Sequence, residues 1–278
     1  MTVIEDQSLD EERALFAMSN LLVRNCRFSG PADGESALKK CKDITVEDTL
    51  FDLRYPLWHD DRVLLRNIEM TENCRAAIWY SRNISVENSR LNGIKVFREC
   101  SNINVSDSSI QSFEYGWKVD GFRMARCPVE SQYAFLCSTG ITLDRVTMTG
   151  KYYLQYVSNV TLDHCSIDTK DALWEAEDVY VRDSVLSGEY LAWYSKRLTL
   201  ENCLITGTQP LCYCKDLRLI HCKVVEADYC FEESEIEAEL TSPVDSIRNP
   251  RSGTITLPSA GNLIQDDPES KARIVLRS

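Results

Sequence analysis

The sequence has little positive charge and no long apolar run. It carries 31 Lys and Arg against 43 Asp and Glu, so the formal net charge is -12 and the pI about 4.8. A chain this acidic is repelled by nucleic acid and by anionic membranes, so we expect neither as a partner. Residues 1–7 lack the basic start and apolar stretch of a signal peptide, and no apolar run is long enough to span a bilayer. We therefore expect a cytoplasmic protein whose twelve cysteines are reduced.

The usual local motifs of catalysis and of metal or cofactor binding are also absent. There is no phosphate-binding glycine loop, no zincin helix and no nucleophile elbow. The most suggestive metal-ligating group contains Cys212, Cys214, His221, Cys222 and Cys230, but its spacing is not that of a common zinc module. We expect no metal and no cofactor, and we interpret these cysteines as core residues.

A repeated phrase organises the chain. Asn83-Ile84-Ser85-Val86-Glu87-Asn88 returns nineteen residues later as Asn102-Ile103-Asn104-Val105-Ser106-Asp107. Further copies begin at Leu21, Ile44, Val63, Phe122, Ile141, Val160, Val179, Leu198, Leu217, Ile236 and Ile255. A fixed period near twenty residues is the mark of a solenoid, in which each repeat buries its apolar side only by stacking on its neighbours.

The pattern inside each repeat indicates short strands. Ile84 and Val86 alternate with polar residues, Asn88 suits a turn, and Asn92-Gly93 suits another turn after a second strand. Nineteen residues leave no room for a helix and three strands, so we predict an all-β, single-stranded parallel β-helix. It would have about 12–13 coils of ~19 residues, with three short strands per coil.

The period crosses every plausible domain boundary, so we predict a single domain covering residues 1–278. Residues 1–20 would form the N-terminal cap or first coil, residues 21–257 the regular coils and residues 258–278 the C-terminal cap. One corner of the repeat carries small residues, which we interpret as a narrow inward corner. This column contains five cysteines, which we expect to be buried: Cys26, Cys127, Cys165, Cys203 and Cys222.

All five tryptophans fall in another column, at the end of the third strand. This column reads Phe16, Lys39, Trp58, Trp79, Arg98, Trp117, Leu136, Gln155, Trp174, Trp193, Cys212 and Phe231. The residue before each tryptophan is suited to the interior, so by strand alternation the tryptophans should point outward. Arg98 lies one coil from both Trp79 and Trp117, which predicts a cation–π stack.

We predict that this aromatic strip binds a ligand, with an oligo- or polysaccharide as the favoured partner. The expected ligand-binding residues are Trp58, Trp79, Arg98, Trp117, Lys118, Trp174, Trp193 and Tyr194. Aromatic faces edged by hydrogen-bonding groups suit sugar rings, and they equally suit an aromatic-anchored protein interface, including an oligomer interface. A third alternative is that the tryptophans stack on one another as rungs and hold the sheet together.

The sequence leaves open whether the protein is an enzyme. Glu99 and Glu175 are the candidate catalytic residues on the strip, yet by the stacking distance of strands they lie about 19 Å apart. Paired-carboxylate hydrolysis requires a separation of about 5 to 10 Å. The densest acidic cluster beside a histidine is His59-Asp60-Asp61, which we interpret as a polar turn between strands.

Several short segments resemble a known family. They are Gly34-Glu35-Ser36-Ala37-Leu38-Lys39, Tyr55-Pro56-Leu57-Trp58, Arg75-Ala76-Ala77-Ile78-Trp79-Tyr80, Gly188-Glu189-Tyr190-Leu191-Ala192-Trp193-Tyr194-Ser195-Lys196 and Asn249-Pro250-Arg251-Ser252-Gly253. In order and spacing they resemble a bacterial domain-of-unknown-function family with a right-handed, pectate-lyase-like β-helix. The resemblance implies the fold and its right hand, which agrees with the usual hand of parallel crossovers, but it implies no activity. Polysaccharide lyases and glycosidases share this fold, which is an association only.

Overall fold

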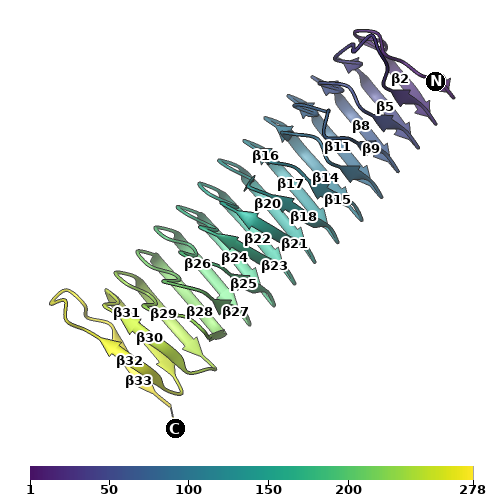
Figure 1. The fold of residues 1–278 in the computed structure, drawn as a ribbon. Helices are drawn as coiled ribbons and strands as arrows, with labels where there is room; N and C mark the ends of the chain where they lie inside the picture. The colour runs from purple at the N-terminus through teal and green to yellow at the C-terminus, as the bar shows by residue number, and fades with distance from the viewer. Residues whose placement is uncertain (278) are drawn as a thin grey trace. The chain divides into compact units, whose positions relative to one another are not determined.

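The computed structural model describes residues 1–277, which divide into two compact units: residues 1–141 and residues 142 onward. Every regular element among the described residues is a β-strand, and the strands pair in parallel (Figure 1). The predicted all-β parallel β-helix is therefore confirmed. The single-domain assignment remains a prediction. None of the described residues belongs to a helix that is long and apolar enough to cross a membrane.

The N-terminal unit has three strands in most coils. The strands of the first side are β1 (Thr2–Glu5), β2 (Ser19–Arg24), β5 (Lys42–Glu47), β8 (Asp61–Arg66), β11 (Arg82–Glu87), β14 (Ser101–Ser106) and β17 (Asp120–Ala125). Those of the second side are β3 (Arg27–Phe28), β6 (Leu50–Phe51), β9 (Glu69–Met70), β12 (Arg90–Leu91), β15 (Ser109–Gln111) and β18 (Pro128–Ser131). The third side contains β4 (Leu38–Lys39), β7 (Leu57–Trp58), β10 (Ile78–Trp79), β13 (Val96–Arg98), β16 (Glu114–Trp117) and β19 (Tyr133–Ala134). β20 (Thr139–Asp144) contains the boundary between the two units.

The core of each coil comes from the inward positions of its strands. Ile84 of β11 pairs in register with Val63 of β8 and Ile103 of β14, and all three side chains are buried. Because neighbouring coils place equivalent residues one above another, a short strand that could not bury its side chains alone forms part of a continuous apolar column. The nineteen-residue hydrophobic period therefore specifies the strand register.

The C-terminal unit keeps the first two sides but changes the third. Its first side contains β22 (Ser158–Asp163), β24 (Glu177–Arg182), β26 (Lys196–Glu201), β28 (Lys215–Val224), β29 (Glu235–Leu240), β31 (Ser252–Leu257) and β33 (Arg273–Leu276). Its other strands are β21 (Thr147–Lys151), β23 (Ser166–Lys170), β25 (Val185–Ser187), β27 (Leu204–Thr206), β30 (Val244–Arg248) and β32 (Ala260–Ile264).

The third side of the C-terminal unit is built from turns. In one coil Asp171, Leu173 and Glu175 have φ values of 54°, 59° and 50°, so left-handed residues alternate with ordinary ones. In this coil residues 171–175 form turns and no strand is assigned to them. Leu173 still points inward and is fully buried, and its N–H donates to the Tyr153 carbonyl at 2.9 Å. The three strands per coil predicted from the sequence are thus found in the N-terminal unit, whereas described residues after 141 follow a two-strand pattern.

Both chain ends continue the stack. β1 pairs with β2, and β33 pairs with β31, so each end adds one strand to the predicted series of repeats. Residues 12–17 form turns in the first coil. The segment assigned to a C-terminal cap contains β32 and β33 and is built as a further coil.

The small-residue corner is a hydrogen-bond ladder as well as a narrow space. The Ile68 N–H donates to Ser89 Oγ at 3.1 Å, and the Ser89 N–H donates to Ser108 Oγ at 3.0 Å. The five cysteines predicted to be buried in this column are buried. A second ladder of the same kind uses Asp60, Ser81, Cys100, Ser138, Ser195 and Ser234 as acceptors.

Gly207 is required by close backbone packing. Its φ is 120°, and a Cβ added there would lie 2.1 Å from the Gly188 carbonyl oxygen. We expect Gly207→Ala to lower the free energy of unfolding by about 2 kcal/mol, because backbone strain and overpacking act together. Gly121→Ala is the control, since its φ of 73° carries strain while the nearest atom to the new Cβ is 3.7 Å away. Equal losses in urea denaturation of the two variants would show that the close approach at Gly207 is unimportant.

Candidate functional site

The tryptophan column of the N-terminal unit forms a stack of rings and cations, here called the N-terminal ladder. Lys39 Nζ lies 3.9 Å from the Trp58 ring centroid, and the Trp58 and Trp79 rings are 5.7 Å apart at an interplanar angle of 10°. The Arg98 guanidinium carbon lies 5.4 Å from the Trp79 ring and 5.5 Å from the Trp117 ring. The cation–π stack expected at Arg98 is therefore present.

This stacking covers both faces of Trp58 and Trp79 and one face of Trp117. Trp79 has Trp58 on one face and Arg98 on the other. All three side chains are only partly exposed. A sugar normally packs its apolar face against an aromatic face, and at Trp58 and Trp79 it would meet ring edges instead. The arrangement matches the alternative in which the tryptophans serve as structural rungs.

Beside the ladder runs a more exposed column of His59, Tyr80, Glu99 and Lys118. The His59 and Tyr80 rings stack with centroids 5.1 Å apart and an interplanar angle of 9°, and Tyr80 is 41% exposed. Burial and the nearby Lys39 lower the pKa of His59, so its imidazole is neutral at pH 7. Glu99 pairs with Arg98 at 3.7 Å, and Lys118 is exposed.

In the C-terminal unit a second aromatic group surrounds Trp174 and Trp193. These two rings lie 5.5 Å apart at 30°, and Trp193 Nε1 donates to the Gln209 carbonyl at 2.7 Å. Next to them Tyr194 and Tyr213 stack with centroids 4.8 Å apart at 15°. Tyr194 is 43% exposed, so this group presents part of an aromatic surface to solvent.

A groove of about 320 Å³ lies beside the stacked tyrosines, and we call it the aromatic groove. It is lined by Glu175, Tyr194, Lys196, Tyr213 and Lys215. The turns of the third side supply the tyrosines, while the two lysines begin β26 and β28. Burial raises the pKa of Tyr213, so its hydroxyl remains a hydrogen-bond donor at neutral pH. The groove therefore offers aromatic surface, hydroxyls, one carboxylate and two ammonium groups.

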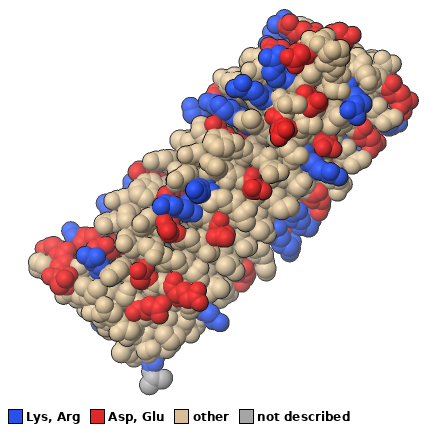
Figure 2. Space-filling model, viewed as in Figure 1, with Lys and Arg blue, Asp and Glu red and all other residues tan. Residues whose placement is uncertain are grey.

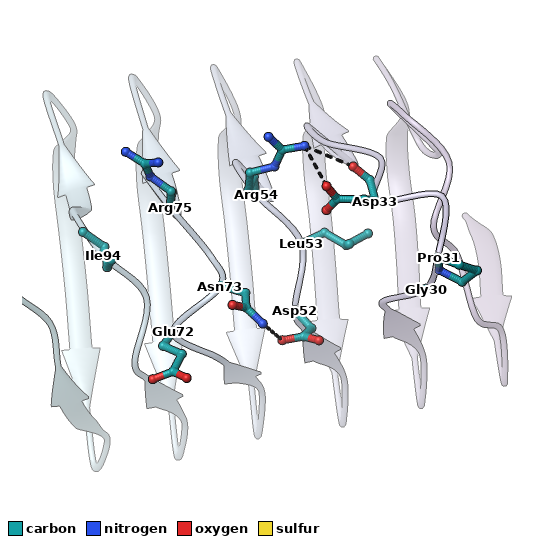
Figure 3. Close-up of a pocket in the computed structure, with 10 residues that line it drawn as sticks. All are labelled: Gly30, Pro31, Asp33, Asp52, Leu53, Arg54, Glu72, Asn73, Arg75 and Ile94. Carbon is teal, nitrogen blue, oxygen red and sulfur yellow. Dashed lines mark hydrogen bonds and ion pairs between the residues drawn. The ribbon is translucent and has the colours of Figure 1, made fainter.

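A larger groove, of about 620 Å³, lies in the N-terminal unit (Figure 3). Its walls include residues from the two long coils of the repeat, where the phrase spacing rises to 23 and 21 residues. Arg54 donates to an Asp33 carboxylate oxygen at 3.1 Å, and Asn73 donates to Asp52 at 3.0 Å. Asp52 also accepts a hydrogen bond from the Thr71 hydroxyl.

By volume alone the larger groove would be the better candidate for a binding site. However, many of its polar groups already form hydrogen bonds or ion pairs with each other. The Arg54–Asp33 and Asn73–Asp52 pairs hold the inserted residues in place, as Figure 3 shows. A ligand would have to compete with both pairs. In the aromatic groove, neither lysine is engaged in an ion pair with another described residue. We therefore take the aromatic groove as the candidate functional site.

One group has the composition of a metal site, namely Asp144, Asp163 and His164, whose potential ligand atoms lie within 4.8 Å of one another. Both carboxylates already have arginine partners, because Arg145 pairs with Asp144 at 2.6 Å and Arg182 pairs with Asp163. The Arg182 hydrogen bond lowers the pKa of Asp163. We assign no metal to this group.

The cysteine group noted in the sequence is not among the potential metal-binding groups of the described residues. Cys214 donates to the Ala192 carbonyl at 3.2 Å and Cys222 to the Leu200 carbonyl at 3.2 Å, whereas His221 is exposed and lies 3.5 Å from Glu239. The sulfurs of Cys214 and Cys222 are thus engaged with backbone carbonyls in the interior.

The predicted ligand-binding residues fall into both units. Trp58, Trp79, Arg98, Trp117 and Lys118 belong to the N-terminal unit. Trp174, Trp193 and Tyr194 belong to the C-terminal unit, as does the candidate acid Glu175, while Glu99 is in the N-terminal unit. Sequence reasoning did not select Tyr213, Lys196 and Lys215. The sequence could have indicated the two lysines, because Lys196 and Lys215 are one repeat apart and place like charges on neighbouring coils.

The chain matches one family model and has several distant structural neighbours. A family described as protein of unknown function (DUF3737) matches residues 2–276. The A-module of the mannuronan C-5 epimerase AlgE6 from Azotobacter vinelandii is 9% identical with a TM-score of 0.41, covering 99% of this chain and 89% of that chain. The surface adhesin PfbA of Streptococcus pneumoniae is 9% identical with a TM-score of 0.35, covering 80% and 68%. HetL, a pentapeptide repeat protein from the cyanobacterium Nostoc, is 11% identical with a TM-score of 0.31, covering 81% and 92%. No curated protein matches the chain.

Proposed function

Because the chain belongs to the DUF3737 family of unknown function, we propose its function from its own side chains: it binds carbohydrate in the aromatic groove. The observation that carries the proposal is the stacked Tyr194–Tyr213 pair, partly exposed beside unpaired polar groups. A sugar ring offers an apolar face and a rim of hydroxyls, and both find partners here. Trp174 and Trp193 lie behind the tyrosines, and the Trp193 hydrogen bond to Gln209 fixes that ring.

Binding fits the groove better than glycoside hydrolysis. Hydrolysis by the usual mechanism uses two carboxyl groups flanking the scissile bond. Among the described residues that line the groove, Glu175 is the one acid. We propose that Glu175 accepts hydrogen bonds from sugar hydroxyls. An enzymatic role for Glu175 would be revealed if the protein cleaved an oligosaccharide and Glu175→Gln abolished the turnover with the fold intact.

The tyrosine pair provides the direct test. We expect Tyr194→Ala and Tyr213→Ala each to weaken oligosaccharide binding roughly fivefold to tenfold, because each removes ring surface and a hydroxyl from the groove. Isothermal titration of the full chain with a panel of neutral and acidic oligosaccharides would measure this. Tyr180→Ala is the matched control, since Tyr180 lies on β24 and pairs with Glu201 instead of lining the groove.

An oligomer interface is the competing use of the exposed aromatic surface. It would be favoured if the wild-type chain sedimented as an oligomer and Tyr194→Ala made it monomeric, while no oligosaccharide bound. Loss of sugar affinity in a variant whose sedimentation is unchanged would support the carbohydrate proposal.

A further inference from the structure

Two lysines of the aromatic groove stand directly opposite each other. Lys196 of β26 and Lys215 of β28 are partners in the parallel register. Adjacent strands are about 4.8 Å apart, and like charges placed opposite each other destabilise a sheet. On its other side Lys196 is in register with Glu177, but that carboxylate pairs with Arg197. Asp216, next to Lys215 in sequence, pairs with Arg218 at 3.3 Å.

Elsewhere on the same side of the coils, charges of opposite sign alternate. In the N-terminal unit Arg24 pairs with Glu47 at 3.2 Å, Glu47 with Arg66 at 2.8 Å, and Arg66 with Glu87 at 3.2 Å. Basic side chains also lie close to acidic ones over much of the face drawn in Figure 2.

One other pair of lysines in the C-terminal unit is also in register. Lys151 and Lys170 are partners on β21 and β23, and there Lys170 is neutralised by Glu189 at 3.0 Å. Among the described residues, Lys196 and Lys215 have no such ion pair. Two adjacent cations that form no ion pair within the described part of the chain, on a protein of net charge -12, are therefore an unusual local feature.

We propose that Lys196 and Lys215 bind the acidic group of a sugar, so that the aromatic groove recognises acidic oligosaccharides, uronates in particular. This inference rests on the carbohydrate binding proposed above. A carboxylate between the two ammonium groups removes their repulsion and forms charge-assisted hydrogen bonds. The tyrosines contact the sugar ring, and Glu175 accepts from its hydroxyls. A small anion without a ring would use the lysines but not the tyrosines.

Galacturonate oligomers and their methyl esters are the decisive probes, because esterification removes the charge of the carboxylate and leaves the sugar ring and its hydroxyls unchanged. We expect the full chain to bind the acid form at least tenfold more tightly than the ester, with the difference shrinking as salt is raised. Lys196→Met and Lys215→Met should each weaken binding of the acid about tenfold, as expected for loss of a charged hydrogen bond, with little effect on the ester. Sulfated oligosaccharides would show whether a sulfate replaces the carboxylate.

The control is a variant carrying Lys151→Met and Lys223→Met, which removes the same charge from exposed sites outside the groove. This control should retain the preference for the acid. The variant that carries both Lys196→Met and Lys215→Met should lose it. Equal binding of acid and ester by the wild type would overturn this inference while leaving the proposed carbohydrate binding in place. Failure of every oligosaccharide to bind would overturn both. Binding of the acid that is insensitive to the lysine variants would place recognition elsewhere.

Discussion

Replacing Asp60 with serine should stabilise the protein by up to about 4 kcal/mol above pH 7. Asp60 is 2% exposed, one carboxylate oxygen accepts the Cys41 N–H at 2.6 Å, and the other has no hydrogen-bond partner. Burial raises the pKa of this carboxyl from 3.8 to about 7. Since a pKa difference of one corresponds to about 1.4 kcal/mol, the ionised group costs the folded state roughly 4 kcal/mol.

The direction in which wild-type stability changes with pH follows from proton binding. Between pH 4 and pH 7 the folded protein retains a proton on Asp60 that the unfolded chain releases, so wild-type stability falls as pH rises through this range. Below pH 4 the carboxyl is protonated in both states and the penalty is absent. Serine has no charge. Ser81 Oγ already accepts the Asp60 N–H at 3.0 Å, so a serine hydroxyl at position 60 can accept the Cys41 N–H in the same way.

Urea denaturation of wild type and Asp60→Ser at pH 4, 6 and 8 would measure the effect. The two proteins should be similar at pH 4 and diverge as pH rises. Asp61→Asn is a control at the neighbouring position, for which we expect a pH-dependent change in stability of the opposite sign. Hydrogen bonds from Arg82 and Asn83 lower the pKa of Asp61 to about 2, so this substitution should destabilise at neutral pH, and the loss should disappear as pH falls through 4 toward 2. A stability difference between Asp60→Ser and wild type that is independent of pH would contradict the prediction.

The same position shows what sequence patterns can and cannot reveal. His59 and Asp60 lie between β7 and β8, as a turn interpretation requires, but Asp61 is already the first residue of β8, and both Asp60 and Asp61 are buried instead of solvated. Asp60 occupies a repeat position that Ser81 and Ser138 fill elsewhere as inward acceptors. Aligning the coils on that column would have predicted an inward side chain. Residue type alone could not, because isolated acids are normally exposed.

The strands and their register were predictable because they depend on local alternation repeated at one period. The turns of the third side were not, since Asp171, Leu173 and Glu175 adopt left-handed conformations without a glycine to mark them. Outward orientation of the tryptophans was predictable from alternation, but ring orientation was not. A period places Trp58 next to Trp79, whereas side-chain torsions decide whether their faces meet each other or solvent.

Removing the ring of Trp79 should lower the free energy of unfolding by about 3 kcal/mol. This ring separates Trp58, 5.7 Å away, from Arg98, 5.4 Å away. Trp79→Ala would lose the packing of a large aromatic side chain and one of the two cation–π contacts of Arg98. The expected loss is at the lower end of the range for aromatic truncation because Trp79 is only partly buried. Urea denaturation would measure it.

Trp79→Phe keeps a ring between the same neighbours, so it should lose less than half as much stability as Trp79→Ala. A loss below about 1 kcal/mol for Trp79→Ala would contradict a structural role for the ladder, given the usual cost of aromatic truncation. Oligosaccharide titration of the same variant separates the two uses of the column. If the aromatic groove is the binding site, Trp79→Ala keeps wild-type affinity while folded. If affinity falls with the fold intact, the sugar contacts the N-terminal ladder, where the sequence places Trp58, Trp79 and Trp117 as ligand-binding residues.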